Sequence, residues 1–114
     1  MPNKYHNKKI VIDGIEFHSK KEGNRYRELK LLERAGLIKD LEIQPAFLLL
    51  PGFKKNGITY QKTTYIGDFK YFDVEQDKYI VEDVKSPATA KDKVYRIKKK
   101  LFEYKYEDLE IKEI

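Results

Sequence analysis

The order in which helical and extended patterns follow one another constrains the fold of this chain most. Residues 19–35 and about 90–106 carry apolar side chains at helical spacing, whereas most of the sequence between them is apolar or alternates as β-strands do. A short alternating segment, 109–114, closes the chain. The order helix, three strands, helix, strand predicts an α/β fold in which helices cover a central mixed sheet.

Local signals set the bounds of these elements. Asp13-Gly14 supplies the positive φ angles of a tight turn, which predicts an N-terminal β-hairpin. Ser19 is a typical N-cap for the first helix, and Gly36 offers its C-terminal stop. Ser86-Pro87 ends the third strand because proline cannot continue a ladder. The predicted strands are 10–12 and 15–17 in the hairpin, then 41–50, 58–72 with a bend at Gly67, 79–85 and 109–114, with a turn at Asn56-Gly57.

Length and composition limit the class of protein. A chain of 114 residues can bury one modest core, so we expect a single domain over residues 1–114. It has no Cys, which excludes disulfides and thiolate zinc sites and makes a cytoplasmic protein the simplest expectation. Residues 1–9 are polar, and no apolar run reaches the length of a membrane span, so we expect neither export nor insertion.

Charge gives a modest preference for a polyanionic partner. The net charge is +5 and the pI is near 9.2, but 38% charged residues of both signs also suit an ordinary solvated surface. Lys4, Lys8 and Lys9 could form a basic N-terminal tail on DNA, although terminal lysines are usually only solvated.

Two candidate site acids, Asp68 and Asp83, stand in segments with β-strand patterns. The two-residue period of a strand places Asp83 and Lys85 on one face and Val84 on the other. Asp68 interrupts an apolar strand, where a carboxylate is costly unless it is paired or bound to a metal. Glu82 points away from Asp83 and is expected to be structural, unless a bulge shifts the register.

A third acid belongs to the first helix. Glu22 precedes Tyr26 by four residues and Leu29 by seven, so it continues the stripe that faces the sheet. Carboxylates from a helix and two strands, beside one lysine, form a ligand set that Mg²⁺ or Mn²⁺ can use while also holding phosphate and water. Lys85 could orient or deprotonate the attacking water, or neutralise the charge that develops on phosphorus.

These residues carry a family resemblance. Asp68 followed by Asp83-Val84-Lys85 resembles the signature of the PD-(D/E)xK nuclease superfamily, and Glu22 matches its helical acid. Gly67 stands where the name of the superfamily has proline. Longer stretches are similar to an uncharacterised phage and prophage family assigned to that superfamily: Val11-Ile12-Asp13-Gly14, Phe17-His18-Ser19-Lys20-Lys21-Glu22, Gln44-Pro45, Tyr65-Ile66-Gly67-Asp68-Phe69 and Val81-Glu82-Asp83-Val84-Lys85.

The resemblance covers nearly the whole chain and implies a function. It implies a restriction-endonuclease-like fold with an αβββαβ core, and a Mg²⁺- or Mn²⁺-dependent endodeoxyribonuclease of a phage in a bacterial host cell. The likeness to Holliday junction resolvases also suggests branched recombination intermediates as substrates. Glu22, Asp68, Asp83 and Lys85 would be catalytic, with the three acids as metal ligands and no small-molecule cofactor.

Each candidate site residue could instead have a purely structural role. Glu22 could complete a capping box with Ser19 and only stabilise the helix. Asp68 could pair with a lysine at a strand end. Asp83 and Lys85 could form a surface ion pair worth at most about 1 kcal/mol. The D-x-K spacing is weak by itself, and the combination with Asp68 and Glu22 strengthens it.

Four further residues are candidates for binding nucleic acid. In the second helix Val94, Ile97, Leu101 and Tyr104 define one apolar edge, and Tyr95, Phe102 and Tyr106 define another. Lys98 lies between these edges, so it either extends to the surface or holds a phosphate near the metal. Arg96 and Lys99 could bind backbone phosphates or only keep the protein soluble. Gln44, placed in a strand before Pro45, could position water or phosphate, although such a residue needs no special role.

Two other classes of function stay open. The chain could be a DNA-binding module or partner subunit that keeps the fold without catalysis, or a protein-interaction domain with a charged surface. If it is a nuclease, one small active site cuts one strand, so a homodimer would cut both strands most simply.

Overall fold

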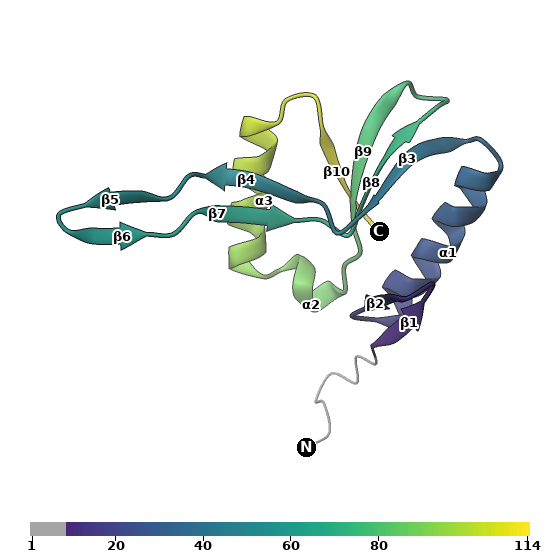
Figure 1. Cartoon of the computed structure of the whole chain (residues 1–114), viewed down its shortest axis with the longest axis horizontal. Helices are drawn as coiled ribbons and strands as arrows, with labels where there is room; N and C mark the ends of the chain where they lie inside the picture. Colours follow the sequence, from purple (N-terminus) through teal and green to yellow (C-terminus); the bar gives the residue numbers. More distant parts are fainter. Residues whose placement is uncertain (1–8) are drawn as a thin grey trace, which may run out of the picture.

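The structure is a computed structural model that describes residues 9–114 (Figure 1). The predictions for Lys4 and Lys8, and for an unexported N-terminus, fall on residues outside this range. No helix within residues 9–114 is long and apolar enough to cross a membrane. The elements are β1 (Ile10–Ile12), β2 (Ile15–Phe17), α1 (Lys20–Arg34), β3 (Ile38–Ile43), β4 (Ala46–Leu50), β5 (Phe53–Lys55), β6 (Ile58–Tyr60), β7 (Thr63–Ile66), β8 (Phe69–Asp73), β9 (Lys78–Asp83), α2 (Pro87–Ala90), α3 (Lys93–Lys105) and β10 (Glu110–Glu113).

The predicted hairpin and first helix are confirmed. Asp13 and Gly14 take φ angles of 53° and 76°, which close β1 onto β2. The Ser19 side chain accepts a hydrogen bond from the backbone of Glu22 and caps α1. Gly36 follows the helix with a φ of 77°, a conformation that glycine adopts at little cost.

A mixed sheet forms the centre of the molecule. Its strand order is β10-β9-β8-β3, in which β9 and β10 are parallel and the other neighbours are antiparallel. Along the chain α1, β3, β8, β9, α3 and β10 follow in the predicted order of helix, three strands, helix, strand. The prediction of a mixed α/β fold is therefore confirmed.

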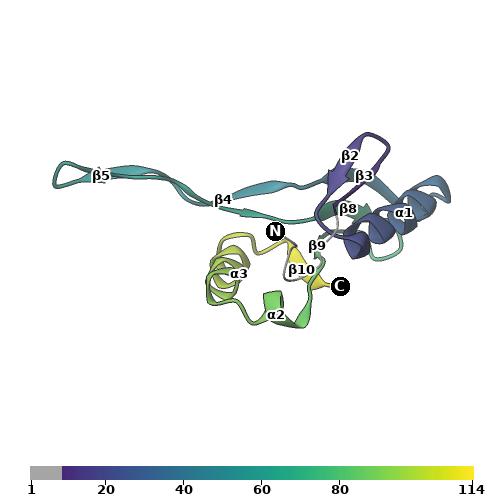
Figure 2. The same ribbon diagram turned by 90° about the horizontal axis from the view of Figure 1, so that it is seen from below.

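The two faces of this sheet bury separate apolar clusters, and β9 contributes to both. Ile80 packs with Tyr26 and Leu29 on the α1 side, whereas Val81 packs with Phe102 on the α3 side. Figure 2 shows α1 and α3 as well-separated helices of the folded body. The alternation of β9 thus decides which of its acids faces which helix.

Residues 46–66 form a long antiparallel ribbon, called here the β-arm, which projects from the body (Figures 1 and 2). Strands β4 and β7 make its base, and β5 and β6 make its tip with the predicted Asn56-Gly57 turn. The predictions of single strands over 41–50 and 58–72 are therefore wrong, because residues 41–50 leave the main sheet for the β-arm and residues 58–72 return from the arm to the main sheet. The return strand breaks at Gly67, where a bend was predicted. Pro45 has no N–H for a ladder, and Gln44, predicted to lie in a strand, sits between β3 and β4 with a φ of 52°.

The second helix also differs from its prediction. The helix predicted over about 90–106 is α3, which begins three residues later because Asp92 caps it, and a separate short helix, α2, precedes it with Ser86 as its cap. Only one of its two apolar edges is covered. Tyr95 and Phe102 are buried against the sheet and the β-arm, whereas Val94 and Ile97 are exposed.

Candidate metal and phosphate site

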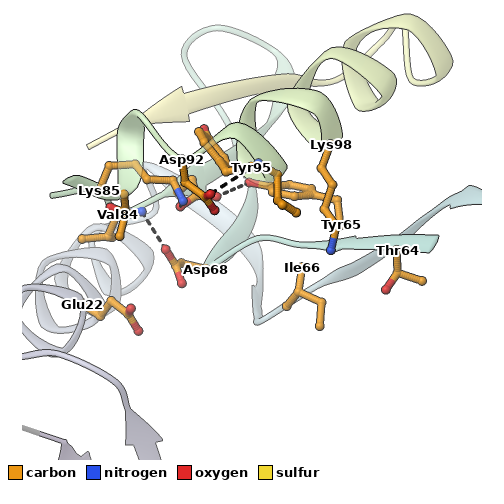
Figure 3. A pocket seen from close by; sticks show the side chains of 13 residues that line it. Glu22, Thr64, Tyr65, Ile66, Asp68, Val84, Lys85, Asp92, Tyr95 and Lys98 are labelled. Carbon is orange, nitrogen blue, oxygen red and sulfur yellow. Dashed lines mark hydrogen bonds and ion pairs between the residues drawn. The ribbon is translucent and has the colours of Figure 1, made fainter. Parts of the chain in front are cut away.

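The four residues that resemble the nuclease signature line one pocket of about 400 Å³ (Figure 3). Glu22 comes from the first turn of α1, Asp68 from the connection between β7 and β8, and Asp83 and Lys85 from the end of β9. Backbone hydrogen bonds assemble this region: the amide of Asp68 donates to the carbonyl of Glu82 (2.9 Å). Segments far apart in the sequence therefore meet at one end of the sheet.

Asp83 and Lys85 form an ion pair on the α3 side of the sheet, as the strand period predicts. Lys85 Nζ lies 2.8 Å from Asp83 Oδ1, and the Tyr65 hydroxyl donates to Asp83 Oδ2. The same ammonium lies 3.6 Å from the centre of the Tyr95 ring. Asp83 is only 4% exposed, so this pair is more constrained than a surface ion pair.

Asp68 is held at the junction of the β-arm and the main sheet. Its Oδ2 accepts a hydrogen bond from the Val84 amide at 2.6 Å. Burial raises the pKa of Asp68 to about 7, with smaller increases from the charges of Glu22 and Asp83. The amide of Gly67 donates to the carbonyl of Pro45 (3.0 Å), a bond that a proline at this position could not make.

Glu22 takes part in only half of the capping box that its sequence context suggests. Ser19 accepts from the Glu22 amide, which is the first half of a capping box, but among the described residues the Ser19 amide donates no reciprocal hydrogen bond to the Glu22 carboxylate. Burial raises the pKa of Glu22, and Asp83 raises it further, while the backbone of His18 and the charge of Lys85 lower it. The charges of Asp83 and Lys85 therefore act on the Glu22 carboxylate and shift its pKa.

The donor set of this pocket fits a divalent cation, although its oxygens are not gathered for one. Within residues 9–114, no three Asp, Glu, His or Cys side chains stand in a ready metal-binding cluster. Asp83 instead turns to Lys85 and Tyr65, and Asp68 turns to the Val84 amide. Such partners offset the mutual repulsion of the acids. The raised pKa of Asp68, caused in part by its neighbouring acids, is the effect that a cation would reverse.

Several residues that hold the site were not predicted. Tyr65 was named only within a stretch of the family resemblance, and Tyr95 only on an apolar edge of the second helix. Their hydroxyls donate to Asp83 and to Glu113 (2.6 Å), respectively. Burial raises the pKa of both tyrosines, so they stay protonated donors. The alternation of β7 places Tyr65 toward α3, a signal that the sequence contained. Lys21 also supports the site, because its Nζ donates to the carbonyl of Lys85 at 2.8 Å.

Glu82 points away from the pocket, as predicted, and it forms an ion pair of its own on the α1 side of the sheet. It is completely buried, and Arg25 of α1 contacts both of its carboxylate oxygens, at 2.7 and 2.5 Å. The Tyr71 hydroxyl donates to it as well. This buried ion pair joins α1 to β9 next to Asp83.

One of the four proposed nucleic-acid contacts lines the pocket. Figure 3 shows Lys98 extending from α3 toward β7, at the rim of the site. Arg96 and Lys99 lie along other hollows of α3, and Lys99 pairs with Glu113 at 3.4 Å. Gln44 is exposed outside the pocket, and its backbone amide donates to the carbonyl of Asp68 (2.9 Å).

A protein-family model described as "Protein of unknown function (DUF1064)" matches residues 2–114. The chain belongs to the DUF1064 family. That description names no activity, so the resemblance to PD-(D/E)xK nucleases stays a prediction for this DUF1064 protein. Comparisons with curated proteins and with solved structures gave no significant match.

Proposed function

We propose that this DUF1064 protein is a metal-dependent DNA endonuclease with a restriction-endonuclease-like core of the PD-(D/E)xK type. The observation that carries the proposal is the meeting of Glu22, Asp68 and Asp83 with Lys85 in one pocket. Such a mixture of carboxylates and one amine suits phosphodiester hydrolysis, in which a phosphate, a cation and water must share a site.

In this proposal the three acids hold Mg²⁺ or Mn²⁺ and Lys85 acts on the substrate. The bound ion would supply charge neutralisation at phosphate and a lower pKa for water. Tyr65 holds one oxygen of Asp83, and the other oxygen, which pairs with Lys85, would be the one to bind the ion. The Lys85 ammonium, held over the Tyr95 ring, would orient the attacking water or neutralise a phosphate oxygen.

The neighbouring groups support this arrangement in defined ways. Glu113 accepts from Tyr95, and its pKa is lowered by that hydrogen bond first and by Lys99 next. The Tyr95 ring is thereby fixed under Lys85. Lys98 at the rim is placed to bind a phosphate next to the one that is cut. Resemblance to resolvases makes four-way junctions the first substrate to test.

Cleavage assays with Asp83→Asn test the proposal. Purified protein is incubated with linear, flapped and four-way-junction DNA in Mg²⁺ or Mn²⁺, and products are resolved on denaturing gels. Asp83→Asn keeps the size of the side chain and removes its charge, so the rate should fall by roughly 10³-fold or more. Glu75→Gln, an exposed acid between β8 and β9, is the matched control and should cleave normally. A wild-type protein that leaves all three DNAs intact in both metals would refute the proposal.

A DNA-binding module without catalysis is the second candidate. The observation that favours it is the β-arm, which has basic residues and no acid, and which could bind DNA whether or not the pocket reacts. This candidate requires salt-sensitive DNA binding that Asp68→Ala does not weaken, together with a wild-type protein that does not cleave.

A further inference from the structure

The tip of the β-arm is exposed and is supported by little else in the molecule. Its base packs on α3, where Phe47 and Tyr65 are buried, but every residue of β5 and β6 is exposed. Neither strand pair of the arm joins the main sheet. Because an isolated two-stranded ribbon is marginally stable in water, an exposed ribbon of this length indicates a contact surface.

The charge of the β-arm is unusual for this chain. Asp and Glu make up 19 of the 114 residues, yet none occurs between Glu42 and Asp68. The charged side chains of the arm are Lys54, Lys55 and Lys62, and all three are exposed. A surface with cations and no anion attracts a polyanion and repels no part of it.

The tip also presents an aromatic pair beside these cations. Phe53 and Tyr60 are cross-strand partners whose rings stack at 4.7 Å, and they are 45% and 44% exposed. Lys55 lies on the same face as this pair, and Lys54 lies on the other face. The ribbon therefore carries positive charge on both faces, which suits an element surrounded by phosphates.

The β-arm begins at the candidate site. Thr64 and Ile66 of β7 line the same pocket as Asp68, and the arm ends at Ile66, two residues before that acid. Lys98 extends toward this strand from α3 (Figure 3). A phosphate backbone that follows the arm would thus pass from the exposed lysines into the pocket.

We propose that the β-arm binds duplex DNA and that Lys54, Lys55 and Lys62 contact its backbone phosphates. A two-stranded β-ribbon fits the major groove of B-form DNA, and the acid-free surface complements its charge. The inference rests on the proposed function in taking DNA as the ligand, but it needs no cleavage. It assigns to the arm the task of holding the duplex while the adjoining strand reaches the acids.

Salt-dependent binding tests this inference without metal. Fluorescence anisotropy with a labelled 20-base-pair duplex, in EDTA, gives the dissociation constant over a range of salt concentrations. In Lys54→Ala/Lys55→Ala/Lys62→Ala, the slope of log affinity against log salt should become shallower by roughly 2 to 3, since each phosphate contact contributes about 0.9. At low salt we expect the affinity to fall by about tenfold or more.

A matched triple variant controls for net charge. Lys30, Lys39 and Lys78 lie on α1, β3 and β9, away from the arm, and their contacts are an ion pair with Glu33, the ring of Phe72 and an ion pair with Glu110. Their combined replacement by Ala should leave the slope within about one unit of wild type. An equal loss in both triple variants would show a general charge effect and overturn the inference.

Further outcomes separate the arm from the active site. Leu50 and Thr63 are cross-strand partners, so Asn-Gly can replace residues 51–62 and close a shorter hairpin on an intact body. This variant should also lose duplex affinity, whereas Glu75→Gln, at an exposed acid between β8 and β9, should bind as well as wild type. Loss of binding in the arm variants of a protein that never cleaves would sustain this inference and refute the nuclease proposal. Normal duplex binding by the arm variants would overturn the inference that the β-arm binds DNA. So would arm variants that change from dimer to monomer while their DNA affinity stays the same.

Discussion

Asp68 stands in an environment far from that of a free carboxylate, because burial and two neighbouring acids raise its pKa to about 7. An acid within an apolar segment predicts a special role, and the structure places Asp68 at the edge of the site pocket. The sequence could not show that its carboxylate binds the Val84 amide or that Glu22 lies near enough to raise its pKa. Both depend on contacts between segments that meet only in the folded chain.

The pKa of Asp68 gives a testable dependence of stability on pH. Its value rises from 3.8 to about 7 in the folded protein, so the native state holds this proton more tightly than the unfolded state does. The contribution of Asp68 is therefore full below pH 3.8 and is lost as pH rises to about 7. In EDTA, Asp68→Asn should raise the melting temperature clearly more at pH 8 than at pH 5, because pH 5 lies inside this window and only part of the contribution is lost there. Equal effects of this variant at both pH values, after subtraction of the Glu75→Gln control, would contradict the assigned shift.

The buried pair of Arg25 and Glu82 makes a second prediction at this scale. Arg25→Met leaves a fully buried carboxylate with Tyr71 as its remaining partner, which should cost about 3 kcal/mol of unfolding free energy. Arg25→Met/Glu82→Gln removes the unpaired charge and should recover much of that loss. Urea denaturation of both variants measures the difference. A double variant no more stable than Arg25→Met would show that the charge is not the cause.

Elements with strong local signals were predicted best. The hairpin and α1 match their predicted bounds closely, because their turns and caps are set by neighbouring residues. The segments 41–50 and 58–72 were misassigned because a β-strand pattern does not say which sheet a strand joins. In α3, two apolar edges were visible in the sequence, and only packing decided that the edge with Tyr95 and Phe102 is the buried one.

The cap of α1 yields a prediction for this element. Ser19 accepts from the amide of Glu22, so Ser19→Ala should destabilise the protein by about 1 kcal/mol. Ser19→Asp keeps an acceptor and should stay within about 0.5 kcal/mol of wild type. Chemical denaturation followed by circular dichroism measures both variants. If Ser19→Asp loses as much as Ser19→Ala, the side-chain cap does not explain the effect.

At the scale of the whole molecule, the main sheet separates a buried ion pair, which supports the fold, from the residues of the candidate site. Its α1 face contains the buried Arg25 and Glu82 pair, and its α3 face contains Asp83, Lys85 and the base of the β-arm. The proposed chemistry therefore lies at the end of the sheet where both faces and the arm meet. This arrangement places one set of acids in each chain.

A single set of acids leads to the prediction of a homodimer. Cutting both strands of a duplex or junction is simplest for a symmetric pair of chains. Light scattering should give twice the mass of one chain, 13.6 kDa, at micromolar concentration or with junction DNA. A mass of one chain under both conditions would contradict the prediction.

The sequence by itself determined features that depend on neighbours along the chain. These are the turn at Asp13-Gly14, the cap at Ser19 and the shared face of Asp83 and Lys85, because turns, caps and strand periodicity are local. Only the tertiary structure decided that β3 and β8 continue into a separate β-arm, that Tyr65 holds Asp83, and that Glu22 faces the pocket. Periodicity tells which residues share a face, whereas long-range packing and hydrogen bonds decide what covers that face.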